Sequence, residues 1–357
     1  MDRKSLRPSM MRNAGLDFVR ALAVLLVIGR HLPLTPDSSL VQRIWHGIGW
    51  IGVDLFFVLS GFLISNLIFE EIERKGVFDV RRFLVRRAFK IYPPFYFLIF
   101  ATLLVGGGDF RTRTVLGEML FLQNYLGSIW NHTWSLAVEE HFYLFWAAIV
   151  TFLLRKSQRI EFGQVLIVYV AVAILCLGAR FSGLYLHPDF SYRLHVFGTH
   201  IRIDSLLLGA LLASAYRSSL YLRTLSGIVK YLALGIGMAI IVLIAFADLE
   251  KSKMLQSVGF TIISFGCALV VLVFVQIEIT SNVVTRTLVN VGKASYVTYL
   301  VHMPVIKVLG FAELKTQYQM PETISVVVTV ATCLMLGALL HTFIEKPVLL
   351  LRDRLAP

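Results

Sequence analysis

The sequence predicts an all-α, polytopic membrane protein with about ten transmembrane helices and both termini in the cytoplasm. Three observations support this fold class. The chain of 357 residues is 57% hydrophobic and only 16% charged, and its mean hydropathy of +0.74 is too high for a soluble domain of this length. Apolar runs of about 18–22 residues, the length that spans a bilayer core, recur along the chain. These runs do not alternate apolar and polar residues, which argues against a transmembrane β-barrel.

Ten segments are predicted to cross the membrane, and a further apolar stretch at 114–126 is expected to be re-entrant or interfacial. The approximate limits of the ten spans are 14–33, 48–69, 92–108, 133–154, 163–181, 201–215, 228–247, 257–276, 294–312 and 322–343. If the N-terminus is cytoplasmic, most of the 34 lysines and arginines fall in cytoplasmic segments, which favours both termini inside. The net charge of +12 is then mostly a topology signal and does not indicate nucleic-acid binding.

The whole chain, 1–357, is predicted to form one membrane-embedded domain. Its non-spanning parts are a cytoplasmic tail at 1–13, a basic amphipathic cytoplasmic loop or helix at 70–91 and a cytoplasmic tail at 344–357. The first apolar run has about 20 residues and no small-residue cleavage site after it, so we expect no cleaved signal peptide. The three cysteines all lie in apolar runs, which predicts core packing and no disulfide framework (Cys176, Cys267, Cys333).

The first span, "FVRALAVLLVIGRHLPL", contains three residues that are unfavourable in hydrocarbon: Arg20, Arg30 and His31. Eleven residues separate Arg20 from His31, so on a helix both lie on one face, about 16 Å apart along the axis. Arg30 points about 100° away and is expected to snorkel outward as an interface anchor. The simple interpretation of His31 is an interfacial histidine at a helix end; the functional interpretation is a catalytic histidine.

Carboxylates also occur in apolar segments. Asp54 comes early in the second span, where it either caps the helix or serves a site, and Ser60 follows it and is able to bond across helices. Glu139 and Glu140 are adjacent in "HTWSLAVEEHFYLFW", at the start of the fourth span. Trp134 and the other aromatic residues of this stretch fit an interfacial belt. An aromatic belt does not account for two glutamates, which therefore indicate a site.

The segment "KGVFDVRRFLVRRAFKIYPP" is basic and amphipathic, because Arg82, Arg86, Arg87 and Lys90 recur at three- and four-residue spacing. One interpretation is a membrane-surface helix that contacts anionic lipid. The other is a site for a ligand rich in phosphate, for which arginine is well suited.

Two later segments add polar groups within predicted spans. Arg202 and Asp204 in "HIRIDSLLLGALLA" are too close in sequence to face each other on a helix, so each is expected to pair elsewhere. In "ASYVTYLVHMP", Ser295, Tyr299 and His302 share one face of a helix. The sequence contains no HExxH, GxSxG or Walker motif, and no metal site is expected.

Taken in order, these segments resemble the membrane acyltransferase 3 family, also called the O-acyltransferase or nodulation-type acyltransferase family. The matching pieces, which extend over nearly the whole chain, are "LDFVRALAVLLVIGRH", "GVDLFFVLSGFLIS", "RRFLVRRAFKIYPPF", "TWSLAVEEHFY", "RIDSLLLGALLA", "SYVTYLVHMP" and "FIEKP". Two positions depart from the family pattern. Lys90 stands where the family usually has arginine, and His141 stands where it often has glutamine.

The resemblance implies a ten-span enzyme of the cytoplasmic (inner) membrane that moves an acyl group, often acetyl, from cytoplasmic acyl-CoA to a hydroxyl of a sugar or glycan. Some relatives carry an extra extracytoplasmic domain, and this chain resembles the stand-alone type. The expected partners are acyl-CoA, a carbohydrate or glycosylated acceptor and membrane lipids, and the chain is compatible with a homo-oligomer. Nucleic acid and metal ions are not expected.

On this basis His31 is the predicted catalytic residue, acting either as a base on the acceptor hydroxyl or as a transient acyl carrier. Glu139 is the predicted partner that orients His31. The donor phosphates are assigned to Arg20, Arg86, Arg87 and Lys90. The remaining candidates are assigned to the pocket or the acceptor side, without individual roles (Asp54, Ser60, Trp134, Glu140, Arg202, Asp204, Tyr299, His302). The competing class is a transporter or channel, since intramembrane charges also line ion paths.

Overall fold

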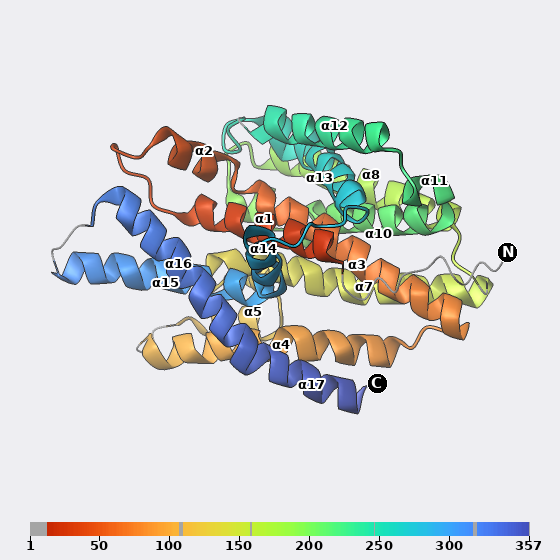
Figure 1. Ribbon diagram of the computed structural model, residues 1–357, viewed down its shortest axis with the longest axis horizontal. Coiled ribbons are helices and arrows are strands. Elements are labelled where there is room, and N and C mark those ends of the chain that lie inside the picture. The colour runs from red at the N-terminus through yellow and green to blue at the C-terminus, as the bar shows by residue number, and fades with distance from the viewer. Residues whose placement is uncertain (1–12, 107–109, 158, 246, 317–319, 357) are drawn as a thin grey trace.

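The computed structural model describes residues 13–106, 110–157, 159–245, 247–316 and 320–356, and every regular element in them is helical (Figure 1). The longer elements are α1 (Ala14–His31), α3 (Ile51–Lys75), α4 (Val80–Val105), α7 (Trp134–Lys156), α8 (Phe162–Leu186), α10 (Ile203–Ser218), α12 (Gly227–Ala245), α13 (Phe260–Phe274), α15 (Ser295–Thr316) and α16 (Glu322–Leu340). Each of them coincides with one predicted span, which confirms the all-α fold class.

Shorter elements connect or extend these helices. They are α2 (Leu40–Ile48), α5 (Thr112–Met119), α6 (Gln123–Leu126), η1 (Asn131–Thr133), α9 (Tyr192–His195), η2 (Thr199–Ile201), α11 (Leu220–Arg223), η3 (Leu255–Gly259), α14 (Val283–Lys293), η4 (His341–Glu345) and α17 (Lys346–Leu355). The stretch 114–126, expected to be re-entrant or interfacial, forms most of α5 and α6.

Eight of the helical stretches in the described residues are long and apolar enough to cross a membrane. The predicted spans that fall short of this standard are the first and the sixth. α1 carries Asp17, Arg20 and Arg30, and α10 has 16 residues. Both pack against α3, which is the most buried of these eight stretches, whereas α12 and α16 are mostly exposed on their outer surfaces.

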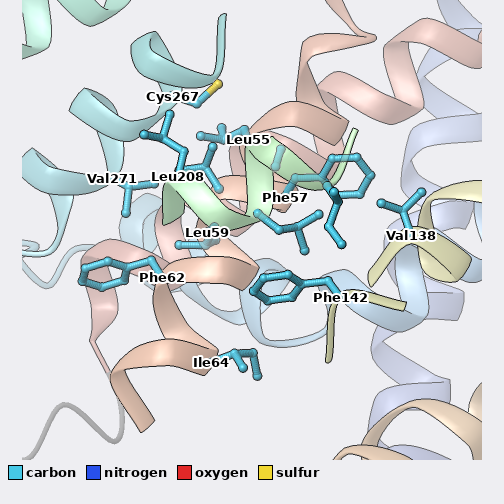
Figure 2. Packing of buried hydrophobic residues seen from close by; sticks show 14 of the residues in the cluster. Leu55, Phe57, Leu59, Phe62, Ile64, Val138, Phe142, Leu208, Cys267 and Val271 are labelled. Atoms are coloured by element: carbon cyan, nitrogen blue, oxygen red, sulfur yellow. The ribbon is translucent and has the colours of Figure 1, made fainter. Parts of the chain in front are cut away.

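The core forms where α3, α7, α10 and α13 meet, and Figure 2 shows their apolar side chains packed together. Close contact between α3 and α10 depends on glycine. A Cβ atom at Gly61 would lie 1.9 Å from the carbonyl oxygen of Leu206, and one at Gly209 would lie 2.1 Å from that of Val58. Gly52 allows α3 to approach α1 in the same way, because a Cβ there would lie 2.5 Å from the Ala23 oxygen.

The basic segment at 70–91 is not a separate element, which corrects the expected boundaries. α3 continues to Lys75 and ends at Gly76, whose φ of 73° is the left-handed conformation that favours glycine at a helix end. α4 then begins after Asp79, whose side chain accepts a hydrogen bond from the Arg82 amide at 2.9 Å. Its first turns carry the basic residues, and the helix continues through Pro93 into the apolar part.

The segment 344–357, expected to be a tail, is helical through Leu355 and continues α16 by way of η4 and α17. In Figure 1 this blue helix runs diagonally across the bundle, and its end lies near the start of α4. η4 is a π-helical turn, and both η4 and α17 contact α4. α14 lies against the first half of α1, where a Cβ at Gly292 would be 1.8 Å from the Asp17 oxygen.

Candidate active site

A cavity of about 120 Å³ lies between α1, α3, α4, α7, α14 and α15. Four cationic side chains line it: Arg20, Arg87, Lys90 and Lys293. The rest of its polar lining is neutral or acidic and includes Ser60, Ser135, Glu139, Tyr143 and Tyr299. The side chains of Arg20 and Lys90 are 37% and 29% exposed, so the basic part of the cavity is accessible to solvent.

Arg20 and Arg87, which the sequence analysis assigns to the donor phosphates, both line this cavity. Arg20 is held by Asp17 one turn earlier on α1, with 3.0 Å between Nη1 and Oδ1. Within the described part of the chain, Nε of Arg87 is a buried atom with no hydrogen-bond partner. A buried donor without a partner is unfavourable, and an anionic ligand in the cavity would satisfy it. Lys293 was missed from the sequence, because its segment reads as an ordinary basic connection.

Arg86 faces away from the cavity, which corrects its expected place beside Arg87. Its guanidinium donates to the Ala356 carbonyl, with 2.5 Å between Nη1 and the oxygen, and pairs with Asp353 at 3.1 Å. Neighbouring residues on a helix differ by about 100° in direction, so Arg86 faces α17 while Arg87 faces inward. Arg86 therefore attaches the C-terminal helix to α4.

Lys90 has a partner that the sequence did not indicate. Its ammonium forms an ion pair with Glu345 of η4, and the other oxygen of Glu345 lies 2.8 Å from Nδ1 of His341. The side chain of Glu345 is 1% exposed. Lys90 therefore lines the cavity while it pairs with a carboxylate that is buried behind the wall.

Glu139 and Glu140 diverge. Glu139 lines the cavity and accepts hydrogen bonds from Tyr143 at 2.6 Å and from Ser60 at 3.2 Å. Glu140 accepts one from Tyr92 at 3.2 Å, on the side of α7 that faces α4. The expectation that Glu139 pairs with His31 is wrong. The ring of His31 contacts His302 of α15 instead.

The hydrogen bonds around His31 fix its tautomer. Nδ1 of His31 lies 2.9 Å from the Val27 carbonyl oxygen, and Nδ1 of His302 lies 2.5 Å from the Tyr299 carbonyl oxygen. A carbonyl only accepts, so both Nδ1 atoms carry the proton. Nε2 of His302 is then an acceptor, and it lies 3.1 Å from Nδ1 of His31. In the neutral ring, this assignment leaves Nε2 of His31 as the unprotonated, basic nitrogen.

A third histidine, His132, completes what we call the histidine group (His31, His132, His302). Its ring centroid lies 4.8 Å from that of His302, and its Nε2 is 3.1 Å from the Leu300 carbonyl oxygen. Sequence reasoning missed His132, although a histidine directly before a predicted span is a usable signal. His31 does not line the cavity formed by the described residues. Tyr299 connects the two places, because its hydroxyl donates to the His132 carbonyl at 2.7 Å while its ring lines the cavity.

A buried carboxylate supports the turn that carries His132. Glu118 of α5 accepts hydrogen bonds from the Ile129 amide at 2.8 Å and from the Thr133 hydroxyl at 3.0 Å. Burial raises the pKa of Glu118 to about 7, although these hydrogen bonds act in the opposite direction.

The remaining predicted residues form structural contacts in the core. Arg202 pairs with Asp54 at 2.6 Å, and Arg180 binds both oxygens of Asp204 at 2.6 and 2.8 Å. The expectation that Arg202 and Asp204 pair elsewhere is therefore confirmed. Trp134 stacks on Phe197, with 4.8 Å between ring centroids. These contacts link α3, α7, α8 and α10 beside the cavity.

Arg30 also differs from expectation. It was predicted to snorkel outward as an interface anchor, but its guanidinium donates to the Tyr192 hydroxyl at 3.0 Å, and that hydroxyl donates to Glu250 at 2.8 Å. Arg30 therefore ties the end of α1 to two distant segments of the chain.

Comparison with known proteins identifies the family of the chain. A family model described as "Acyltransferase domain" (Acyl_transf_3) matches residues 13–342. The O-acetyltransferase OatA of Staphylococcus aureus (strain NCTC 8325 / PS 47) is 29% identical over 358 residues, which cover 94% of this chain and 57% of OatA. An O-acetyltransferase candidate of Staphylococcus aureus (strain COL), SACOL0978, is 31% identical over 320 residues, or 82% of this chain and 50% of that protein.

The chain thus spans about half the length of the curated relatives it matches. No solved structure gives a significant match. The family model extends from the start of α1 into η4 and so includes every helix that lines the cavity. The chain therefore belongs to the acyltransferase 3 family.

Proposed function

We propose that this protein is an integral-membrane O-acyltransferase that moves an acyl group, acetyl in the first instance, from cytoplasmic acyl-CoA to a hydroxyl of a sugar or glycan. The observation that carries the proposal is the cavity itself, which has four cations along part of its wall and is connected through Tyr299 to the histidine group. The printed names of the relatives, which describe O-acetyltransferases, support acetyl as the group and oxygen as its acceptor.

The donor's phosphates bind the cationic part of the cavity in this proposal. Arg20, Arg87 and Lys293 present positive charge there, and Nε of Arg87 has no hydrogen-bond partner among the described residues. CoA carries its thioester at the end of a long, thin pantetheine arm. Arg20 and His31 are eleven residues apart on α1, so helix geometry separates them by about 16 Å along the axis. The arm lies along this face of α1, and the thioester reaches His31 past Tyr299.

His31 acts at the thioester through Nε2. As a base, Nε2 takes the proton of the acceptor hydroxyl while the hydroxyl oxygen bonds to the carbonyl carbon of the thioester. The carbon–sulfur bond then breaks, and the proton passes to the departing sulfur of CoA. As an acyl carrier, Nε2 first attacks the carbonyl carbon itself, the carbon–sulfur bond breaks, and the sulfur of CoA leaves with the proton of Nδ1. The acceptor hydroxyl then attacks the acyl carbon, the bond from that carbon to Nε2 breaks, and the hydroxyl proton returns to the imidazole. A covalent acyl-histidine trapped without acceptor would distinguish the second route from the first.

Topology completes the proposal. Both termini lie in the cytoplasm, the chain is a multi-pass protein of the cytoplasmic membrane, and the cationic part of the cavity opens toward cytoplasmic acyl-CoA. The basic segments at the α3–α4 connection and at α17 lie at one end of the bundle, whereas α2 lies at the other end (Figure 1). This segregation of basic residues supports the orientation.

The proposal is tested with purified protein in lipid nanodiscs, supplied with acetyl-CoA and fractions of cell-envelope saccharides. We expect thiol release that depends on the saccharide, together with a mass increase of one acetyl group in it. Thiol release with no acylated saccharide would indicate a hydrolase, and an absence of thiol release with every acceptor and acyl-CoA tried would contradict the assignment. A comparison of surface saccharides from cells with and without the gene identifies the acceptor.

A further inference from the structure

The segment "FIEKP", residues 343–347, is one of the pieces by which the sequence resembles the family, and it directly follows the residues that the family model matches. The proposed function uses none of it. It lies where α16 passes through the π-helical turn η4 into α17. A π-turn changes the direction in which side chains leave a helix and is frequent at functional sites. Here Phe343 is 72% exposed, whereas the Glu345 side chain is 1% exposed and points into the bundle.

Glu345 contacts the cavity wall through Lys90. One carboxylate oxygen pairs with the Lys90 ammonium, and the other lies 2.8 Å from Nδ1 of His341. Lys90 lines the cavity, and its ammonium lies 5.7 Å from the ring centroid of Tyr296 on α15. Glu345 is not among the described residues that line the cavity.

The charges around Lys90 explain why its ammonium needs the Glu345 carboxylate. Arg20, Arg87 and Lys293 share the cavity with Lys90, and Glu139 lines it as well, so positive charge is in excess around the ammonium. Like charges and burial both disfavour the charged form of a lysine and push its flexible side chain away. A buried carboxylate opposes both effects, and removing one partner of a buried ion pair leaves the other unsatisfied.

We propose that Glu345 is a positioning residue for the acyl donor: its carboxylate holds the Lys90 ammonium, charged, at the cavity wall, where it binds a donor phosphate. This inference rests on the proposed function. Glu345 acts through Lys90 and does not touch the donor, so it affects donor binding and leaves the acyl-transfer step unchanged.

The first test separates binding from chemistry. Glu345→Gln keeps the shape of the side chain and removes its charge. We expect the KM for acetyl-CoA to rise about tenfold, the change that corresponds to about 1.4 kcal/mol, with kcat within about twofold. The matched control is Asp353→Asn, which removes the exposed partner of Arg86 on the same C-terminal helix and is expected to leave KM unchanged. An unchanged KM in Glu345→Gln would overturn the inference.

The second test asks whether Glu345 acts only through Lys90. Lys90→Met alone is expected to raise KM, and adding Glu345→Gln to it is expected to raise KM no further, as a coupled pair requires. An additive increase would overturn the inference. The double variant also removes both charges of the pair, which keeps the test usable if Glu345→Gln alone fails to fold.

A third variant supplies a rescue. Arginine stays charged without a counter-ion, so Lys90→Arg combined with Glu345→Gln is expected to recover most of the donor affinity lost in Glu345→Gln. No recovery would contradict a role through the charge of residue 90. If Lys90→Met leaves KM unchanged, the donor role of Lys90 in the proposed function fails. If Lys90→Met raises KM and Glu345→Gln does not, only the role of Glu345 fails.

Discussion

Arg86 and Arg87 are adjacent on α4 and have different surroundings. Arg86 binds Asp353 and the Ala356 carbonyl of the C-terminal segment, whereas Arg87 lines the cavity with a buried nitrogen that has no partner among the described residues. A guanidinium aimed into a cavity is suited to a phosphate, and one already held by a carboxylate is suited to holding two helices together.

This difference gives a matched pair of variants. Arg87→Gln is expected to raise the KM for acyl-CoA about tenfold, since hydrogen bonds to charged groups contribute about 1.5–3 kcal/mol. Arg86→Gln is expected to leave KM unchanged. Initial rates over a range of acetyl-CoA concentrations measure both, and equal effects in the two variants would contradict the assignment of Arg87 to the donor.

His302 is expected to act on the rate and not on donor binding. Its Nε2 faces the protonated Nδ1 of His31 at 3.1 Å, and this contact helps to orient the basic Nε2 of His31. His302→Ala is expected to lower kcat by roughly 100-fold, within the range of general-base effects, with the KM for acyl-CoA nearly unchanged. A variant with normal kcat and a raised KM would place His302 in the donor site instead.

Part of the site could be predicted from helix periodicity. The spacing of Arg20 and His31, and that of Ser295, Tyr299 and His302, places each set on one helical face, and this information is local. The partner of His31 was not local. The sequence offered Glu139 as the partner of His31. The packing of α15 against α1 places His302 beside His31 instead. Lys293 lines the cavity because α14 packs against α1, and this packing also could not be predicted from the local sequence.

The contact between α3 and α10 tests helix packing at the scale of an element. Gly61 on α3 has the Leu206 carbonyl where a Cβ would stand, at 1.9 Å, and the obstruction is backbone that side-chain rotation does not relieve. Gly61→Val is therefore expected to separate the helices and lower the melting temperature in detergent sharply, with loss of monodisperse protein.

Gly178→Val on α8 is the control, since the space around that Cβ position is open to 4 Å. Fluorescence-detected size-exclusion chromatography after heating compares the two variants with the unmodified protein. Equal thermal stability of all three would show that the close approach of α3 and α10 is not required.

Hydropathy identified all ten long helices, because a bilayer-length apolar run is a strong local signal. It misplaced the ends of several of them, among them α3, α4 and α16. The polar first turns of α4 were expected to form a separate loop or helix, and the turns of α17 a tail. Asp79 caps α4, and contacts with Arg86 and Lys90 hold the C-terminal helix against it. Polar helical turns that pack on their neighbours carry no hydropathy signal.

At the scale of the whole molecule, orientation is the property on which the donor site depends. The native cysteines Cys176, Cys267 and Cys333 are buried, so a single introduced cysteine reports its own accessibility. In intact cells we expect Lys253→Cys to react with a membrane-impermeant maleimide and Arg155→Cys to react only after permeabilisation. The reverse pattern would place the cationic part of the cavity on the side without acyl-CoA.

The central claim is that His31 carries out acyl transfer at the end of a path that begins at the cationic part of the cavity. The most direct measurement is acetyl transfer from acetyl-CoA to saccharide by His31→Ala in nanodiscs, beside His46→Ala. His46 lies on α2, near the same end of the bundle, with Nδ1 3.2 Å from the Leu32 carbonyl oxygen. We predict a loss of at least about 100-fold in kcat for His31→Ala and near-normal turnover for His46→Ala. Undiminished turnover in His31→Ala would contradict the account.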